Sequence, residues 1–453
     1  MAGQQSRDWT RFNHKTAPPS GTSPSPNPPA TYDTYTLGSK TITKAVIQEH
    51  AMAELDRVCF VATKDFLNNI LPVDRQTLDR VYRAVVPTLY EKRRWKGFPS
   101  PTAKYKEEHL YQPFVDVANA IMRSAKEVVP ANENQVHQAV WKDYHTKAPQ
   151  SLEPDAARIR PDCALAMAIA DAVISDSSVL NAKKETLWWL QLVAVVEAKR
   201  DFDQKDEDLI IQLLGYLRLM MVEQKDRRFT LSVFLSSTQV SVWLQDRSGV
   251  LGMDVPINIH QVHPMDFIHV IATLAILPAH RLGFNPSMKL AREPLPPIHT
   301  YHFLSEGPDK FNVEMYKKSN YAMQWVITVE KEVFITLRAM SPLCTDVVSG
   351  SGSIVWAVIR YVDRQKDPDM CAVYVLKQLW KSDGQADEGA IYEYLCQMRA
   401  TSSNPGAKYV GEMECREVVK IEGAVDSTEG LIRRGLESVP PPPSMPPAGS
   451  KRS

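Results

Sequence analysis

The sequence has no excess of charge of either sign, because its 453 residues contain 53 Lys and Arg against 53 Asp and Glu. Net charge therefore gives no reason to expect nucleic acid or an acidic membrane as a partner of the whole chain, although a local basic patch stays open. The six cysteines include no CxxC pair, and the eleven histidines include no HExxH sequence. A disulfide framework and a zinc site are therefore not expected.

Long hydrophobic runs are also missing. The longest apolar stretch, 267–279, is interrupted by His269 and Pro278, whereas a helix that crosses a bilayer needs about 20 apolar residues. The first residues, MAGQQSRDWTRF, are polar and contain no apolar core of a secretory signal. These absences predict a soluble intracellular protein, cytoplasmic or nuclear, without a membrane partner.

Proline is concentrated in three places. APPSGTSPSPNPPA lies within residues 1–40 and PPPPSMPPAGSKRS within 437–453. Such segments bury too little apolar surface to fold, so a disordered Pro-rich arm and a Pro-rich tail are predicted there. The third place, PSMKLAREPLPPIHTY, marks a boundary between a domain at 41–290 and a domain at 301–436.

The two central blocks carry different patterns. Block 41–290 has helical periodicity at 46–71, 78–90, 107–129, 207–224 and 264–277, and its strand signals are ALAMAIADAVI, LVAVVEAK, FTLSVFL and VSVWLQD. This mixture predicts an α/β sandwich. In block 301–436, QWVITV and VFITLR flank Glu330-Lys331 as a hairpin, a second strand pair follows, and a helix is predicted at 385–399. The predicted fold class is therefore α+β / α/β, a sandwich followed by an antiparallel sheet with one helix.

Two charged residues lie on a strand that is otherwise apolar. In LVAVVEAK, Glu197 and Lys199 are two residues apart and so point to the same face. Burying them costs several kcal/mol unless they pair or bind something. Upstream lies Asp162 in RPD, and on the following helix Gln212 and Tyr216 share a face. The carboxylates could hold Mg²⁺ while the lysine activates a water, or the cluster serves structure or binding alone.

This Asp…Glu-x-Lys pattern, followed by a helix with Gln, resembles the PD-(D/E)XK nuclease-like superfamily over residues 107–245. The resemblance implies a Mg²⁺-dependent nucleic-acid hydrolase, with nucleic acid as partner. It assigns metal ligation to Asp162, Glu197 and Glu108, with Glu107 an equal candidate for the last, and catalysis to Lys199 and Gln212.

A second pattern follows in the C-terminal block. SGSGSIVWAV is a glycine-rich turn with Gly350 and Gly352, Lys377 ends the next strand, and Glu388 begins a helix. A kinase needs this order, because the glycine loop covers the phosphates, the lysine binds them and the glutamate holds the lysine. The pattern predicts weak ATP binding at these four residues. A Gly-Ser turn with one surface lysine is the alternative.

The segments LYQPF, RPD, VVEAK, DRSGV, VLKQLW, ADEGAIYEYL and DSTEGLIRRGL together resemble the fungal-type protein kinase family. The resemblance implies a nuclease-like region followed by a kinase domain. However, the sequence contains neither an HRD catalytic loop nor a DFG motif. We therefore expect a truncated kinase relative without phosphotransfer activity, acting as a binding or regulatory module whose incomplete kinase lobe takes a protein partner. A Mg²⁺-dependent hydrolase and a fragment of a complete kinase are the alternatives.

Overall fold

The fold is taken from a computed structural model. It describes residues 48–49, 51–52, 54–129, 139–151, 158–167, 187–201, 206–260, 264–291, 324–340, 350, 352–381, 384–385, 387–401 and 412–439. The chain divides into Met1–Lys40, which lies outside the described residues, and the compact unit Thr41–Ser453. The boundaries predicted at 290 and 301 stay predictions.

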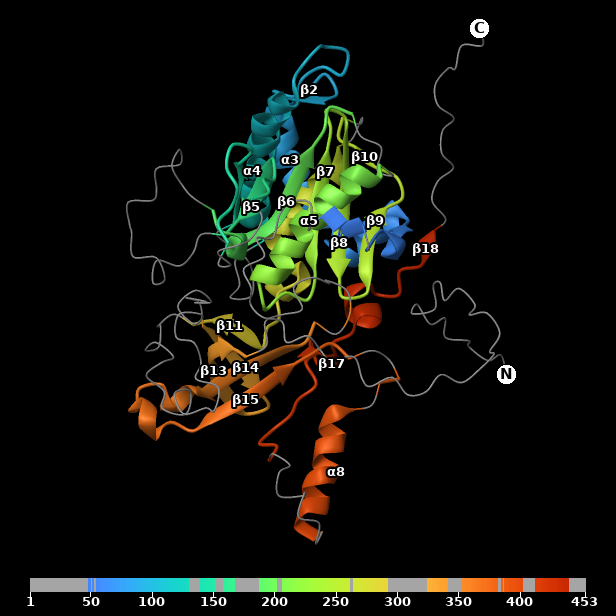
Figure 1. The fold of residues 1–453 in the computed structure, drawn as a ribbon. Helices are drawn as coiled ribbons and strands as arrows, with labels where there is room; N and C mark the ends of the chain where they lie inside the picture. The colour runs from blue at the N-terminus through green and yellow to red at the C-terminus, as the bar shows by residue number, and fades with distance from the viewer. Residues whose placement is uncertain are drawn as a thin grey trace, which may run out of the picture. The chain divides into compact units, whose positions relative to one another are not determined.

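A mixed sheet organises the first part of the described chain (Figure 1). Its strands follow the order β18-β1-β9-β8-β7-β6-β5-β4, and β10 pairs with β8. The bounds are β1 (Val58–Val61), β4 (Val140–Asp143), β5 (Cys163–Ala166), β6 (Leu192–Ala198), β7 (Thr230–Leu235), β8 (Gln239–Asp246), β9 (Gly249–Met253), β10 (Ile257–Asn258) and β18 (Ser438–Val439).

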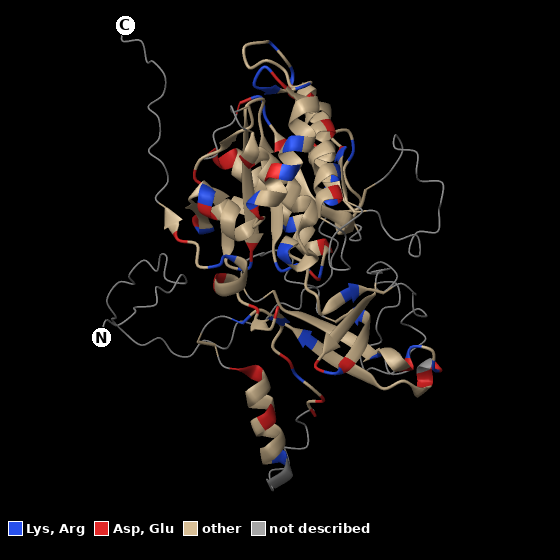
Figure 2. Cartoon of the chain, turned by 180° about the vertical axis from the view of Figure 1, so that it is seen from behind, with Lys and Arg blue, Asp and Glu red and all other residues tan. Residues whose placement is uncertain are grey.

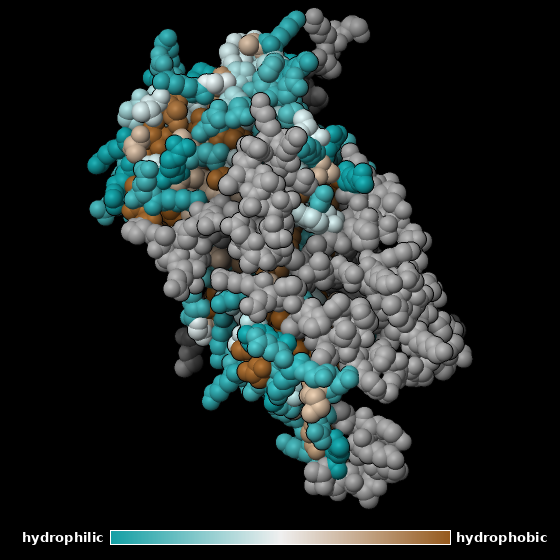
Figure 3. All heavy atoms as spheres, turned by 90° about the vertical axis from the view of Figure 1, so that its left-hand side faces the viewer, coloured by the Kyte–Doolittle hydropathy of each residue, from teal (hydrophilic) through white to brown (hydrophobic). Residues whose placement is uncertain are grey.

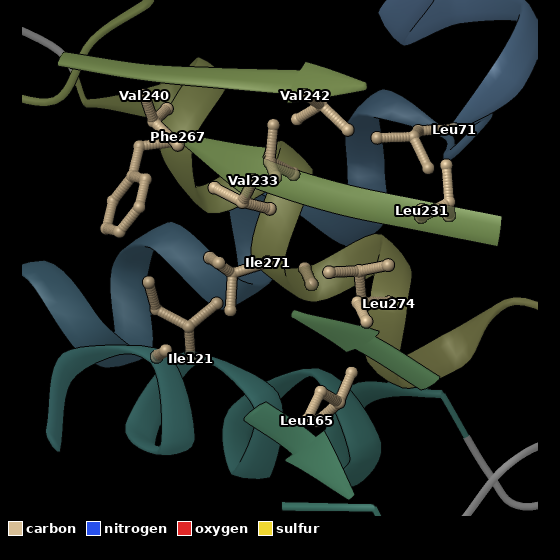
Figure 4. Close-up of a cluster of buried hydrophobic side chains, with 14 of the residues drawn as sticks. Leu71, Ile121, Leu165, Leu231, Val233, Val240, Val242, Phe267, Ile271 and Leu274 are labelled. Atoms are coloured by element: carbon tan, nitrogen blue, oxygen red, sulfur yellow. The ribbon is translucent and has the colours of Figure 1, made fainter. Parts of the chain in front are cut away.

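Helices cover both faces of this sheet, as the sandwich prediction requires. The helices α3 (Arg75–Leu89), α4 (Tyr111–Val128) and α6 (Met265–Ile276) share one apolar cluster with Val193 and Val196 of β6. The helix α5 (Glu207–Glu223) packs with Leu192 and Val195 in a second cluster. Figure 4 shows the first cluster, where side chains of α4 and α6 meet those of β5, β7 and β8. Smaller elements are α2 (Thr63–Ile70) and the hairpin β2 (Tyr90–Glu91) with β3 (Arg94–Trp95).

The strand β6 is buried along its whole length, as its apolar sequence predicts. It pairs antiparallel with β5 and parallel with β7, and α5 forms the crossover between the two parallel strands. The side chain of Asp206 caps α5 by accepting from the backbone N–H groups of Asp208 and Leu209. Because Val195 faces α5, the alternation of the strand also directs Glu197 toward that helix.

A separate antiparallel sheet follows, with the order β11-β12-β13-β14-β15. Its strands are β11 (Met288–Leu290), β12 (Trp325–Val329), β13 (Glu332–Ala339), β14 (Ile354–Arg360) and β15 (Val373–Gln378). Both predicted strand pairs are confirmed, and Glu330 in the β12–β13 turn adopts a φ of 53°. The predicted helix is α8 (Glu388–Thr401). The chain therefore has the predicted α+β class.

The segment after α8 is attached to the mixed sheet. It contains β16 (Lys420–Ile421) and β17 (Ala424–Val425), then β18, which pairs antiparallel with β1. Arg433 donates two hydrogen bonds to Asp246, of 2.7 and 2.9 Å, and both side chains are buried. Arg228 likewise pairs with Asp426 in a buried contact. Long-range ion pairs thus fix this segment to the sheet.

Two predictions about local structure were wrong. Helical periodicity at 46–71 predicted one helix, but β1 interrupts it by pairing in parallel with β9, nearly two hundred residues later in the chain. The Pro-rich tail was predicted from 437, yet Ser438 and Val439 form β18. Residues 440–453 lie outside the described residues, as do residues 1–40 and residues 292–301 of the predicted boundary.

The surface carries mixed charge. Figure 2 shows Lys and Arg interspersed with Asp and Glu along the helices and loops, in accord with the zero net charge of the sequence. Figure 3 shows a mainly hydrophilic described surface on one face, with smaller hydrophobic areas between. Every helix in the described ranges is too short or too polar to span a membrane.

Candidate functional site

The end of β6 gathers the charged residues predicted from the sequence. Asp162 directly precedes β5, and its Oδ2 accepts the backbone N–H of Ala198 at 2.8 Å. This bond holds the Asp162 carboxylate against the end of β6, close enough to Glu197 and Lys199 for their charges to act on one another. The structure therefore brings Asp162, Glu197 and Lys199 into one site, which we call the lysine–carboxylate cluster.

Glu197 is the most buried member of the cluster, with 1% of its surface exposed. Its Oε1 accepts from Lys199 Nζ and, at 2.7 Å, from Gln212 Nε2. Its Oε2 lies 2.9 Å from the hydroxyl of Tyr216. Burial and the nearby charge of Asp162 raise the pKa of Glu197 to about 7, although the contacts with Lys199 and Tyr216 oppose the rise. The carboxyl can therefore hold or release a proton near neutral pH.

Lys199 bridges two acidic residues. Besides Glu197, its Nζ contacts Glu107 Oε1 at 3.3 Å, from the short 3-10 helix Glu107–Leu110. Burial lowers the pKa of Lys199, but the attraction of Glu197, Glu107 and Asp162 outweighs it, and the net pKa is raised. Glu108 is half exposed and pairs with Lys106 at 3.5 Å instead. Of the two candidates in EEHL, the structure places Glu107 at the cluster and Glu108 away from it.

Sequence reasoning missed three polar neighbours of the cluster. Tyr111 hydrogen-bonds Asp162, and its ring lies 4.9 Å from that of His145. His145 Nδ1 in turn contacts Asp143 Oδ1 at 2.5 Å. Burial raises the pKa of Asp162, against the hydrogen bonds from Ala198 and Tyr111. The LYQPF run contains Tyr111, but no motif pointed to Asp143 or His145.

The C-terminal block brings its lysine and glutamate together. Lys377, on β15, donates to both carboxylate oxygens of Glu388, the first residue of α8, at 2.7 and 2.6 Å. The two side chains are 41% and 44% exposed. β15 ends at Gln378 and α8 begins at Glu388, so the ion pair joins the end of the strand to the start of the helix.

The glycine turn contacts the mixed-sheet region. The N–H of Gly350 donates to the backbone oxygen of Arg247 at 2.8 Å. At Gly352, φ is 48° and a Cβ would lie 2.7 Å from the guanidinium carbon of Arg247. Both positions therefore need glycine for conformation or for space. The two glycines thus contact Arg247 of the mixed-sheet region, whereas Lys377 pairs with Glu388.

The order of these segments matches a known family. A family model described as fungal protein kinase matches residues 169–444, more than half of the chain. The chain belongs to the fungal protein kinase family. Comparison with curated proteins gives no match. The matched range includes Glu197, Lys199 and the whole Gly350–Glu388 region, whereas Asp162 lies upstream of it.

The cluster residues do not fit a Mg²⁺ ion as they are arranged. Lys199 and Gln212 occupy Oε1 of Glu197, and the Tyr216 hydroxyl lies against Oε2, while Asp162 is engaged with Ala198 and Tyr111. Among the described residues, no group of three His, Cys, Asp or Glu side chains is placed to bind a metal. Mg²⁺ prefers several oxygen ligands, so we derive no metal-dependent step at this cluster.

Proposed function

We propose that this chain is a kinase-like protein that does not transfer phosphate as it stands, and that it acts as a binding or regulatory module. Its antiparallel sheet binds ATP weakly, and α8 takes a protein partner. The observation that carries the proposal is the Lys377–Glu388 ion pair, formed in a sequence with neither an HRD nor a DFG motif. Membership of the fungal protein kinase family supports the kinase-like assignment.

The ion pair supplies one part of a kinase site. In kinases the strand lysine binds the α- and β-phosphates and the helix glutamate positions it. Here both partners are about two-fifths exposed, and exposed pairs contribute only about 0–1 kcal/mol. Lys377 can therefore leave Glu388 and bind a phosphate at little cost in free energy. Because the site is exposed, solvent also weakens the new contact between Lys377 and the phosphate. Weak nucleotide binding follows.

Phosphoryl transfer needs groups that this sequence does not supply. A catalytic-loop Asp accepts the proton of the attacking hydroxyl, and the DFG Asp anchors the metal that neutralises the charge on the phosphates. Neither motif occurs in the 453 residues. Lys377 and Glu388 can position a nucleotide, but no residue of these motifs is present to deprotonate a substrate.

The helix α8 supports the partner proposal. Ile391, Tyr394 and Met398 are spaced to share one face, and they are 47%, 58% and 44% exposed. No described α8 residue belongs to any of the apolar clusters of the described chain. Exposed apolar faces of this kind mark interaction sites. A protein surface with its own apolar groove is the partner that this face fits.

Equilibrium binding of ATP to the purified chain tests the proposal. We expect weak binding at the antiparallel sheet, and Lys377→Ala is expected to reduce the affinity of that site about tenfold, the effect of one charge-assisted contact. The control is Lys381→Ala, which removes the same charge from an exposed position three residues after the end of β15. A phosphate-transfer assay is expected to show no turnover; turnover that Lys377→Ala abolishes would contradict the proposal.

The Mg²⁺-dependent hydrolase stays a prediction of the sequence. Its support is the connection α4-β4-β5-β6-α5-β7, which sets Asp162, Glu197 and Lys199 at adjoining strand ends. The occupied oxygens of Glu197 weigh against it. Cleavage of DNA or RNA with added Mg²⁺ that Lys199→Ala abolishes would establish it over the charge-paired cluster.

A further inference from the structure

A polar cavity lies beside the lysine–carboxylate cluster. It has a volume of about 250 Å³ and is lined by Gln48, Arg158, Ile159, Arg160, Ile211, Gln212, Gly215 and Tyr216. This volume lies just below the roughly 300–1,000 Å³ range of small-molecule sites. Two of its residues, Gln212 and Tyr216, also contact Glu197. The cavity and the cluster therefore share a wall.

Two arginines give the cavity its charge. Arg158 and Arg160 flank Ile159, which is 8% exposed and packs into the apolar cluster under α5. The backbone oxygen of Arg160 also accepts from Tyr216 at 2.7 Å, which ties the segment to α5. Both arginines therefore line the cavity from a segment that is tied to α5.

Neither arginine has a carboxylate partner within the part of the chain that the structure describes. Both side chains are exposed to solvent and so are free to meet a ligand that enters the cavity. A guanidinium presents several N–H donors in a fork that matches phosphate oxygens. The unpaired charges at Arg158 and Arg160 therefore favour a ligand with phosphate groups.

The helix α5 provides the opposite chemistry. Ile211 and Gly215, four residues apart, form an apolar row beside the polar row of Gln212 and Tyr216. Gly215 has no side chain, so a flat ring can lie over this row. Gln212 gives its amide N–H groups to Glu197 and to Tyr216 at 2.7 and 2.9 Å, which leaves its carbonyl oxygen as an acceptor.

We propose that this cavity binds a nucleoside phosphate, with its phosphates on Arg158 and Arg160 and its base over Ile211 and Gly215. The Gln212 carbonyl is placed to accept a hydrogen bond from the base. The site is separate from Lys377 and goes beyond the nucleotide binding proposed for the antiparallel sheet. It gives the mixed-sheet region a ligand of its own next to the cluster.

Calorimetric titration of the full chain with ADP, without metal, tests the site. The titration uses the Lys377→Ala variant, so that any binding through Lys377 is already removed. Adding Arg158→Gln and Arg160→Gln is expected to weaken ADP binding about 100-fold, because two charge-assisted contacts are lost. Inorganic pyrophosphate is expected to compete with ADP. The ADP affinity of the Arg158→Lys, Arg160→Lys variant is expected to lie between those of the parent and the double Gln variant. The lysines keep the positive charge but lack the forked N–H donors of arginine.

The control variant is Lys92→Gln with Arg93→Gln, which removes two positive charges from the exposed β2–β3 turn. It is expected to leave ADP binding unchanged, and the unfolding temperatures of all variants are compared to show that they are folded. No ADP binding in the Lys377→Ala chain would overturn the proposal, as would binding that ignores both arginines. Binding of a single-stranded oligonucleotide but not of ADP would also overturn it.

Discussion

Two lysine–glutamate pairs in this molecule have the same chemistry and different surroundings. Glu197 and Lys199 lie at the end of a strand buried on both faces, with side chains 2% and 30% exposed. Lys377 and Glu388 join an outer strand to an exposed helix, with side chains 41% and 44% exposed. The first pair has further polar neighbours in Gln212, Tyr216 and Glu107. In the second pair, Lys377 is the hydrogen-bond partner of Glu388.

Burial decides what each pair can do. A carboxylate removed from water is stable only while its partners remain, so the cost of breaking the first pair is high. Water replaces either partner of the second pair, so its contribution to folding is small. The buried pair is therefore suited to fixing structure and holding a proton. The exposed pair is suited to exchanging one anion for another.

Removing the lysine of the buried pair should have the largest effect. Lys199→Ala leaves Glu197 and Asp162 close together without their cation, and we expect a loss of roughly 3 kcal/mol of unfolding free energy at pH 8. Glu197 can take up a proton in the variant, which removes the repulsion from Asp162 and so limits the loss. Each unit by which the pKa of Glu197 exceeds the pH corresponds to about 1.4 kcal/mol in favour of the protonated form. Denaturant unfolding measures it. A loss below about 1 kcal/mol would mean that the cluster is as solvated as the exposed pair.

The sequence could predict much of this site, because strand alternation is local. The spacing of Glu197 and Lys199 predicted a shared face, and the RPD and Gln-bearing segments predicted their neighbours. The sequence could not separate Glu107 from Glu108, because the direction of each side chain depends on the 3-10 turn at Glu107–Leu110.

Contacts between distant segments were beyond the sequence patterns. VCFV at 58–61 fits a helical period, but its parallel pairing with β9 makes it a strand, so tertiary pairing overrides local preference. Sequence patterns also could not predict the ion pair between Arg433 and Asp246, because the two residues are 187 positions apart in the chain. The apolar period of α8 predicted a helix, yet it gave no sign that Ile391 and Tyr394 would stay exposed.

The pH dependence of folding gives the next effect. Because the pKa of Glu197 is raised to about 7, the folded chain binds its proton more tightly than the unfolded chain. Stability is therefore greatest below the unfolded pKa and falls as pH rises toward 7. We expect this term to be on the order of 2 kcal/mol between pH 5 and 7. Glu197→Gln should reduce the slope, and unfolding in urea at several pH values measures it.

The control for this slope is Glu108→Gln, which removes an exposed carboxylate one residue from Glu107. It should keep the slope of the unchanged chain. Asp162, whose pKa is also raised by burial, contributes in the same direction, so Glu197→Gln is expected to flatten the slope without abolishing it. A slope that is equal in both variants would show that Glu197 is ionised throughout this range.

The exposed pair should give the smallest change in stability. Lys377→Ala removes one partner from a contact that solvent already screens, and we expect a loss of less than about 1 kcal/mol in unfolding free energy. Glu388 then faces water and keeps its charge at no large cost, unlike Glu197 in the Lys199→Ala chain. Thermal unfolding of Lys377→Ala beside Lys199→Ala measures the contrast directly. Equal losses in the two variants would mean that Glu388 is buried in solution and that its pair with Lys377 contributes as much to stability as the buried pair.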